Sequence, residues 1–201
     1  MTRISPSVDR LVDALQFLPG VGPKSATRMA LLMLQGERAG AERLAKCIQE
    51  AVELVHACSV CRNLSEAEVC EICSSPKRDP KLLCIVESVS DVIAIESSGQ
   101  FSGRYFVLHG RLSPIDGVGP SDLGLDRLPP LVAERGVKEV VLATNPTIEG
   151  EATAQFISES LEGQATAVTR IAHGVPIGGE LEYVDGGTIA HAIRGRVRVG
   201  S

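Results

Sequence analysis

Apolar residues recur at helical spacing near the start of the chain and predict three amphipathic helices. The first is expected over residues 7–18, with an apolar face of Val8, Leu11, Val12, Leu15 and Leu18. Pro23 suits the first position of a second helix, whose inward residues are Ala26, Met29, Ala30 and Met33. A third is expected over residues 41–57, with Leu44, Ile48, Val52 and Val55 on its apolar face.

From Lys81 onward the pattern changes to short continuous apolar runs, which are typical of strands buried on both faces. These runs cover residues 82–86, 105–108, 137–143 and 165–171. Helical stretches lie between them, near residues 89–96, 123–135 and 149–161. The alternation predicts an α/β fold with a parallel sheet covered by helices on both sides. Ligands of such sheets gather beyond the carboxyl ends of the strands.

Composition and charge narrow the function classes. The 201 residues allow one sizeable domain with small satellites, and no apolar run is long enough to span a membrane. Aromatic residues make up only 3%, which disfavours recognition of stacked bases. The net charge is −5, yet residues 1–46 carry +3 and the remainder −8, so phosphate contacts are expected in the N-terminal segment. Arg194, Arg196 and Arg198 form a second basic run, which is either a solvated tail or a second contact.

The turn between the first two helices reads Leu-Pro-Gly-Val-Gly-Pro-Lys, from Leu18 to Lys24. Gly20 and Gly22 permit backbone angles that other residues resist, and the amides at the start of the second helix form an anion site. Lys24 and Arg28 add positive charge beside it. The segment resembles the helix-hairpin-helix DNA-binding motif; the alternative is a plain pair of helices. A P-loop is excluded, because Pro23 stands where glycine must precede the lysine.

Four cysteines stand as two pairs, Cys58-x2-Cys61 and Cys70-x2-Cys73, eight residues apart. This spacing predicts one structural Zn²⁺ per chain held by four thiolates. Two disulfides or four free thiols are the alternatives, and no signal-peptide run follows Met1, so a cytosolic chain with few disulfides is expected. Cys47 and Cys84 are expected to be small core residues rather than ligands.

Acidic residues follow two of the predicted strands: Glu87 and Asp91 after the first, and the segment from Ala143 to Glu151 after the third. This arrangement resembles a toprim domain, whose enzymes hold Mg²⁺ with a Glu and an Asp-x-Asp pair. Here Asn145 and Thr147 stand at the two Asp positions, although Glu87, Glu149 and Glu151 remain. An amide and a hydroxyl bring no negative charge, and the two tyrosines lie elsewhere in the sequence, so a scaffold without phosphoryl-transfer chemistry is expected.

The order of these parts resembles the RecR family of bacterial recombination mediators. Two further strings carry the resemblance, residues 108–120 and residues 169–183. It implies a non-enzymatic protein that works with RecO, and often RecF, to help load RecA onto single-stranded DNA coated by SSB. It also implies a cytoplasmic, nucleoid-associated homo-oligomer, a tetrameric or dimeric ring that clamps single- or double-stranded DNA without sequence preference.

Carried over to this chain, the resemblance implies roles for particular residues. Gly20, Gly22, Lys24 and Arg28 would contact DNA, the four paired cysteines would bind zinc, and the surface around Glu87, Asn145, Glu149 and Glu151 would face RecO. The expected domains are residues 1–57, 58–73, 81–176 and 177–201. The last segment contains a string similar to a Walker B motif, residues 180–185, for which we favour a packing role. His109, His173 and His191 are expected to be loop or packing residues.

Two other functions remain as alternatives. A toprim nuclease or topoisomerase would use Glu87, Glu149 and Glu151 with a metal ion, and an RNA-binding zinc protein would prefer RNA over DNA.

Overall fold

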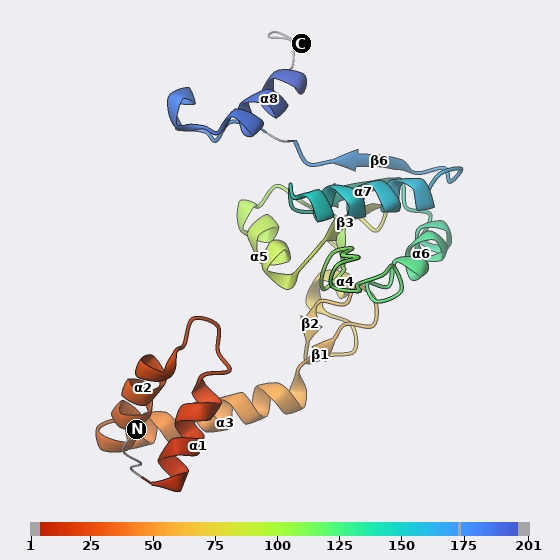
Figure 1. The fold of residues 1–201 in the computed structure, drawn as a ribbon. Helices are drawn as coiled ribbons and strands as arrows, with labels where there is room; N and C mark the ends of the chain where they lie inside the picture. Colours follow the sequence, from red (N-terminus) through yellow and green to blue (C-terminus); the bar gives the residue numbers. More distant parts are fainter. Residues whose placement is uncertain (1–4, 173, 197–201) are drawn as a thin grey trace. The chain divides into compact units, whose positions relative to one another are not determined.

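The structure is a computed structural model that describes residues 5–172 and 174–196 (Figure 1). His173 and Arg198, which the sequence analysis assigned to a loop and a basic run, lie outside the described residues, as does Met1. The chain divides into two compact units, Met1–Val55 and His56–Ser201.

The first unit is helical, as the sequence predicts. It contains α1 (Pro6–Leu15), α2 (Pro23–Gln35) and α3 (Arg38–Leu54). Ser5 caps α1 by accepting a hydrogen bond from the Val8 amide at 3.3 Å. Ala26 and Ala30, both fully buried on α2, are small enough to let the helices approach closely.

The predicted ends of two helices are wrong in this unit, and the third helix also begins earlier than expected, at Arg38. The first helix ends at Leu15 rather than at residue 18, because the amides of Gln16, Phe17 and Leu18 each bond three residues back and tighten the turn. The third helix ends at Leu54, and His56–Ala57 becomes a short strand instead of a last helical turn.

The second unit contains a small cysteine-rich part, an α/β sheet and a C-terminal segment. The first consists of β1 (His56–Ala57), β2 (Leu64–Ser65) and α4 (Glu71–Ser74). The sheet strands are β3 (Leu82–Val86), β4 (Arg104–Val107), β5 (Glu139–Ala143) and β6 (Ala167–Arg170). The helices around them are α5 (Val89–Ser98), the 3₁₀ turn η1 (Leu125–Arg127), α6 (Leu128–Arg135) and α7 (Ile148–Ser160). The last segment holds the 3₁₀ turn η2 (Leu181–Tyr183) and α8 (Gly186–Arg194).

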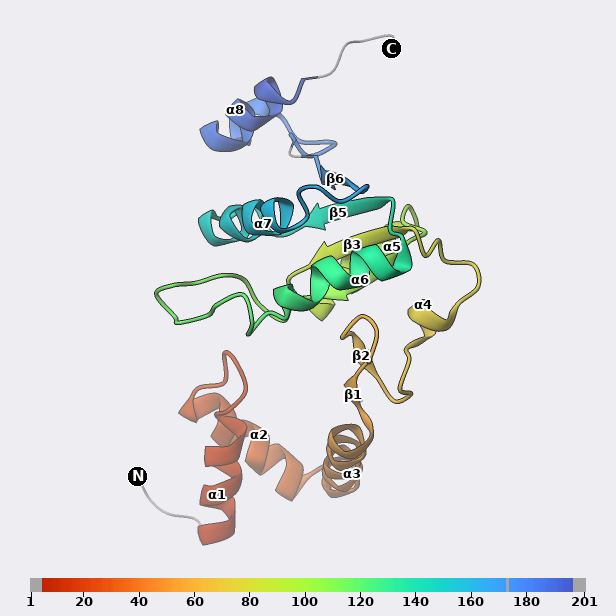
Figure 2. The ribbon, with the colours of Figure 1, turned by 90° about the vertical axis from the view of Figure 1, so that its right-hand side faces the viewer.

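All four sheet strands run parallel in the order β4-β3-β5-β6. Because side chains alternate along a strand, β3 supplies both cores. Leu83 and Ile85 join α6 and α7 on one face, whereas Cys84 and Val86 join α5 on the other. Figure 2 shows α6 in front of β3. The predicted α/β fold with helices on both sides is confirmed.

The expectation that every strand is buried on both faces is wrong for β6. It lies at the edge of the sheet, and its residues alternate between exposed and half-buried. The helix predicted over residues 123–135 is also shorter than expected, because Gly124 takes a left-handed conformation at φ 69° and a 3₁₀ turn follows before α6 begins at Leu128.

The described residues contain no helix that is both long enough and apolar enough to cross a bilayer.

Candidate nucleic-acid interface and metal centre

The turn that joins α1 to α2 exposes the start of α2; we call residues 19–28 the hairpin corner. Gly20 has φ 77°, a left-handed conformation that glycine tolerates, and the Val21 amide closes the turn onto the Leu18 carbonyl at 3.1 Å. Gly22 does not have the special conformation expected, because its φ of −86° and ψ of 174° are ordinary extended values. As the N-cap of α2 it has no side chain to bond the first amides of the helix, and the space around its Cα is open.

Charge and shape at the hairpin corner suit an anion. Gly22, Pro23, Lys24 and Ser25 line an open surface hollow of about 470 Å³. Lys24 and Arg28 are both exposed on α2, four residues apart. A helix of thirteen residues presents a partial positive charge at its start, so amides, dipole and side chains all favour a phosphate there.

The four paired cysteines gather in the cysteine knuckle, which we define as residues 56–75. Their sulfur atoms lie within 4.8 Å of one another, and all four side chains are buried. Arg62 has φ 66°, which turns the chain sharply after Cys61, and its amide donates to the Cys58 carbonyl at 2.9 Å. All six cysteines lie within the described residues and none of them forms a disulfide, so the disulfide alternative is not realised.

Backbone amides prepare the cluster for thiolate ligands. The Cys70 amide points at the Cys58 sulfur at 3.3 Å, and the Asn63 amide points at the Cys61 sulfur at 3.5 Å. Burial raises the pKa of the Cys58 thiol, but hydrogen bonds from the amides of Cys70, Cys61 and Val60 outweigh it and lower the pKa to about 6. By contrast, a side-chain hydrogen bond with Cys73 raises the pKa of the Cys61 thiol, and burial raises that of Cys70 to about 11. Four sulfurs in a closed, buried cluster fit a structural Zn²⁺, whose charge deprotonates the thiols with a raised pKa.

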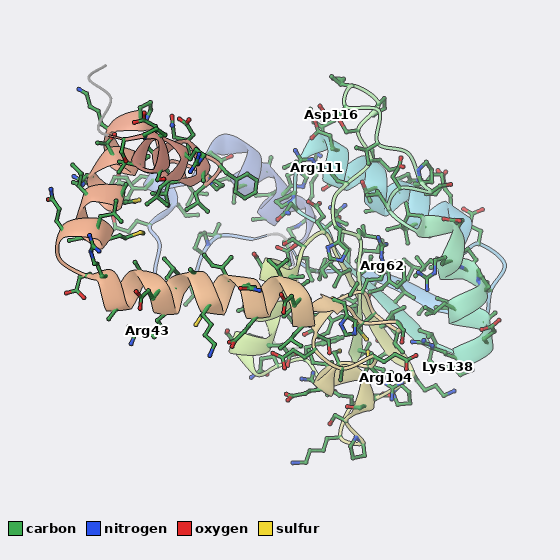
Figure 3. All side chains as sticks on the ribbon, turned by 90° about the horizontal axis from the view of Figure 1, so that it is seen from below. Arg43, Arg62, Arg104, Arg111, Asp116 and Lys138 are labelled. Carbon is green, nitrogen blue, oxygen red and sulfur yellow. The ribbon has the colours of Figure 1, made fainter. Side chains whose placement is uncertain are left out.

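Arg62 ties the cysteine knuckle to the sheet, and sequence reasoning missed this residue. Its guanidinium lies 5.6 Å from the centre of the Phe106 ring and donates to the carbonyl of Leu123 (Figure 3). The His109 ring bonds the Arg62 carbonyl at 2.7 Å. Spacing along the sequence gives no signal for these contacts, since they join residues far apart in the chain.

The two other cysteines differ from each other. Cys84 is buried in β3, as expected, and burial raises the pKa of its thiol to about 12. Cys47 is exposed on α3, so the expectation that it is a core residue is wrong. The apolar face of α3 is itself exposed within the chain, which explains the error.

Glu87 and Asn145 meet at the carboxyl ends of β3 and β5; with Glu149 and Glu151 we call this region the carboxyl edge. The Glu87 carboxylate is buried, with 5% of its residue surface exposed. Its two oxygens accept hydrogen bonds from the backbone amide and the side-chain amide of Asn145, both at 2.8 Å. Glu149 and Glu151 lie in the first turn of α7, where Thr147 caps the helix.

The acids of the carboxyl edge do not all converge on one another. Glu151 forms an ion pair with Arg170 of β6, a residue that sequence reasoning did not assign to the site. Asp91 is used in the capping box of α5, where it accepts from the amide and the hydroxyl of Ser88, both at 2.8 Å.

The sequence is similar to known proteins over nearly its whole length, so the hairpin corner, the cysteine knuckle and the carboxyl edge all lie within the region of similarity. A protein of Saccharophagus degradans described as "Recombination protein RecR" is 59% identical over 195 residues, which cover 97% of this chain and 99% of that protein. A protein of Hahella chejuensis with the same description is 54% identical over 193 residues, 96% of each chain. The chain belongs to the RecR family. This membership links it to DNA recombination and repair.

Family models match the RecR parts in turn along the chain. The RecR helix-hairpin-helix model matches residues 8–52, the RecR four-cysteine zinc-finger model residues 55–75, the toprim model residues 81–172 and the RecR C-terminal model residues 174–197. The predicted resemblance is therefore confirmed. The zinc-finger match and the cluster of four sulfurs together establish one structural zinc.

Proposed function

We propose that this chain is a non-enzymatic recombination mediator that binds DNA through the hairpin corner. The single observation that carries the proposal is the exposed start of α2 with Lys24 and Arg28 beside it, in a chain whose remaining residues are net acidic. Gly20 shapes the turn, and Gly22 leaves room for the phosphate backbone to approach. Contacts of this kind carry no base information, so binding to single- and double-stranded DNA without sequence preference follows.

The partners are proposed from the family. The chain works with RecO, and with RecF where that protein takes part, to help load RecA onto single-stranded DNA coated by SSB. The carboxyl edge is the proposed RecO surface, because Glu149 gives it negative charge and Ile148 beside it is 87% exposed. This activity is placed in the cytoplasm, at the nucleoid.

Assembly into a ring, a tetramer or a dimer, is supported by the apolar face of α3. Leu44, Ile48 and Val52 lie four residues apart on this helix and are 46%, 56% and 78% exposed. A row of apolar side chains of this kind is typical of a helix that packs against another chain. Several hairpin corners around one DNA molecule would raise the effective concentration without new chemistry.

Each part of the chain then has a task. We assign DNA contact to residues 1–57, zinc-dependent folding to residues 58–73, partner contact to residues 81–176 and support of assembly to residues 177–201. No bond is broken by any of them.

The test is a RecA-loading assay on SSB-coated single-stranded DNA, together with DNA titrations in the presence and absence of RecO. We expect loading to need both the chain and RecO, and to fail with Lys24→Glu, Arg28→Glu. The double variant Lys77→Glu, Lys138→Glu changes the charge equally on exposed residues outside the hairpin corner and is expected to load RecA normally.

Two results would overturn the proposal. Cleavage or relaxation of DNA in Mg²⁺ or Mn²⁺ that is lost in Glu149→Ala would establish the toprim enzyme instead. A strong preference for RNA in competition would favour the RNA-binding alternative.

A further inference from the structure

Two acids of the carboxyl edge, Glu87 and Glu151, and the nearby Asp91 are held by donors of the protein itself. Both Glu87 oxygens accept from Asn145, Asp91 accepts from Ser88, and Glu151 pairs with Arg170. A toprim enzyme would turn such carboxylates toward Mg²⁺. In this chain, a cation that approached Glu87 would compete with two hydrogen bonds of 2.8 Å, one on each carboxylate oxygen.

The first turn of α7 packs closely against Glu87 and the backbone of Asn145. A Cβ atom added to Gly150 would lie 2.1 Å from the Asn145 carbonyl oxygen and 2.9 Å from Glu87 Oε1. The Thr144 hydroxyl, fully buried, donates to the Gly150 carbonyl at 2.9 Å and holds the first turn of α7 in this position. Mg²⁺ sheds its water reluctantly and requires near-octahedral oxygen ligands, so a carboxylate whose two oxygens already accept from Asn145 is a poor ligand for it.

A positive charge is nevertheless present beside these acids. The Arg170 guanidinium pairs with Glu151, and its Nη2 lies 3.5 Å from the Thr144 hydroxyl. An arginine remains charged throughout the ordinary pH range. The edge therefore has an internal cation where toprim enzymes rely on an external one.

We infer that Asn145 replaces the divalent cation of the toprim site, by donating both of its amide groups to Glu87. The consequence is that the native chain binds no Mg²⁺ or Mn²⁺ at the carboxyl edge. Exchanging the amide for a carboxylate, in Asn145→Asp, removes one donor and adds a second acid beside Glu87. That variant is expected to gain a divalent-cation site.

The test uses the full, zinc-loaded chain and Mn²⁺ as the probe. Binding is followed by the electron paramagnetic resonance signal of free Mn²⁺, and Tm is measured with and without Mn²⁺ at constant ionic strength. We expect native protein to show no Mn²⁺ binding up to millimolar concentration and no shift of Tm. Asn145→Asp is expected to have a lower Tm than the native chain and to recover about 5 °C in saturating Mn²⁺.

Two variants control this comparison. Asn145→Ala removes the side-chain donor without adding charge, so its Tm is expected to fall and not to recover with Mn²⁺. Gln100→Glu adds one negative charge at an exposed position after α5 and is expected to show no Mn²⁺ response.

The inference fails on either of two results. Native protein that binds Mn²⁺, with the binding lost in Glu87→Gln, would show an open cation site despite Asn145. A folded Asn145→Asp protein that neither binds Mn²⁺ nor gains Tm from it would show that Asn145 is not what excludes the cation. The measurement on native protein stands even if a variant fails to fold.

Discussion

The backbone amide of Val107 donates to the carbonyl of Cys61 at 2.9 Å. Val107 is the last residue of the edge strand β4, and Cys61 is a ligand residue of the cysteine knuckle. An edge strand presents unpaired backbone groups, and here the knuckle satisfies one of them. Ile72, between Cys70 and Cys73, packs against both the cysteine cluster and the core on the α5 face of the sheet. The metal centre and the sheet are therefore joined by hydrogen bonding and by apolar packing.

Loss of zinc is expected to destabilise the sheet as well, because of these contacts between the cysteine knuckle and β4. Zinc contributes on the order of 10 kcal/mol to the folding of small zinc-finger peptides, so Cys58→Ser is expected to unfold the cysteine knuckle and to lower Tm. Hydrogen exchange of the Val107 amide should accelerate at the same time. Zinc content is measured by metal analysis, and Cys47→Ser, which alters an exposed thiol, should retain one zinc per chain. Unchanged protection of Val107 in zinc-free protein would contradict the coupling.

Removing charge at the hairpin corner should change the salt dependence of DNA binding. Each lost phosphate contact lowers the slope of log K against log salt by about 0.9 on duplex DNA. For Lys24→Glu, Arg28→Glu we therefore expect a slope smaller by about 1.8 per bound chain, with far-UV circular dichroism unchanged. Fluorescence anisotropy over a range of NaCl concentrations measures it. Lys77→Glu, Lys138→Glu serves as the control, and Figure 3 shows Lys138 in the second unit. If both variants lowered the slope of log K against log salt equally, the hairpin corner would not be the DNA-binding site.

The exposed apolar face of α3 predicts a defect in assembly. Ile48→Glu with Val52→Glu would place two charges in a contact between chains, and each buried charge costs on the order of several kcal/mol. We expect smaller species in analytical ultracentrifugation than the native protein forms. Gln49→Glu introduces the same residue on a neighbouring face of the helix and should assemble normally. A native protein that sediments as a monomer would refute the predicted contact.

Glu96 should make stability depend on pH in the acidic range. A hydrogen bond from Arg78 is the main cause that lowers the pKa of Glu96 below its usual 4.5; burial opposes it, and the Tyr105 hydroxyl, which donates at 2.6 Å, adds to the lowering. A carboxyl with a lowered pKa in the folded chain stabilises fully above its unfolded pKa, and this stabilisation is lost as pH falls through the folded value.

Glu96→Gln is therefore expected to cost about 2 kcal/mol at pH 7 and progressively less below pH 4.5. Urea unfolding of both proteins at matched pH, with zinc in excess, gives the difference. Glu162→Gln, at an exposed position, should show no such trend. A difference that grows toward low pH would contradict the assignment.

Sequence reasoning succeeded where the signal is local. The spacing of Cys58, Cys61, Cys70 and Cys73 is a property of two short turns, and the apolar run of β3 reports burial on both faces directly. Sequence reasoning failed for contacts between residues that lie far apart in the chain. The contact between Arg62 and Leu123 joins residues 61 positions apart, and the ion pair of Arg170 with Glu151 depends on which strand lies at the sheet edge.

The conformation of the glycines and the exposure of α3 were two further properties that the sequence did not predict. Gly20 and Gly22 look alike in the sequence, yet only Gly20 has a positive φ among the two. The apolar face of α3 was correctly located by its spacing, but periodicity alone does not say whether the chain itself or another chain covers that face. Cys47 was misplaced for this reason.

The exposure of Cys47 has a practical consequence. Among the six cysteines of the chain, it alone is accessible, while the other five are buried. A maleimide dye or a spin label should therefore attach at one defined place on α3 of the unaltered polypeptide. Two such reporters in neighbouring chains would reveal by energy transfer or dipolar coupling when subunits come together around a nucleic acid and when they part.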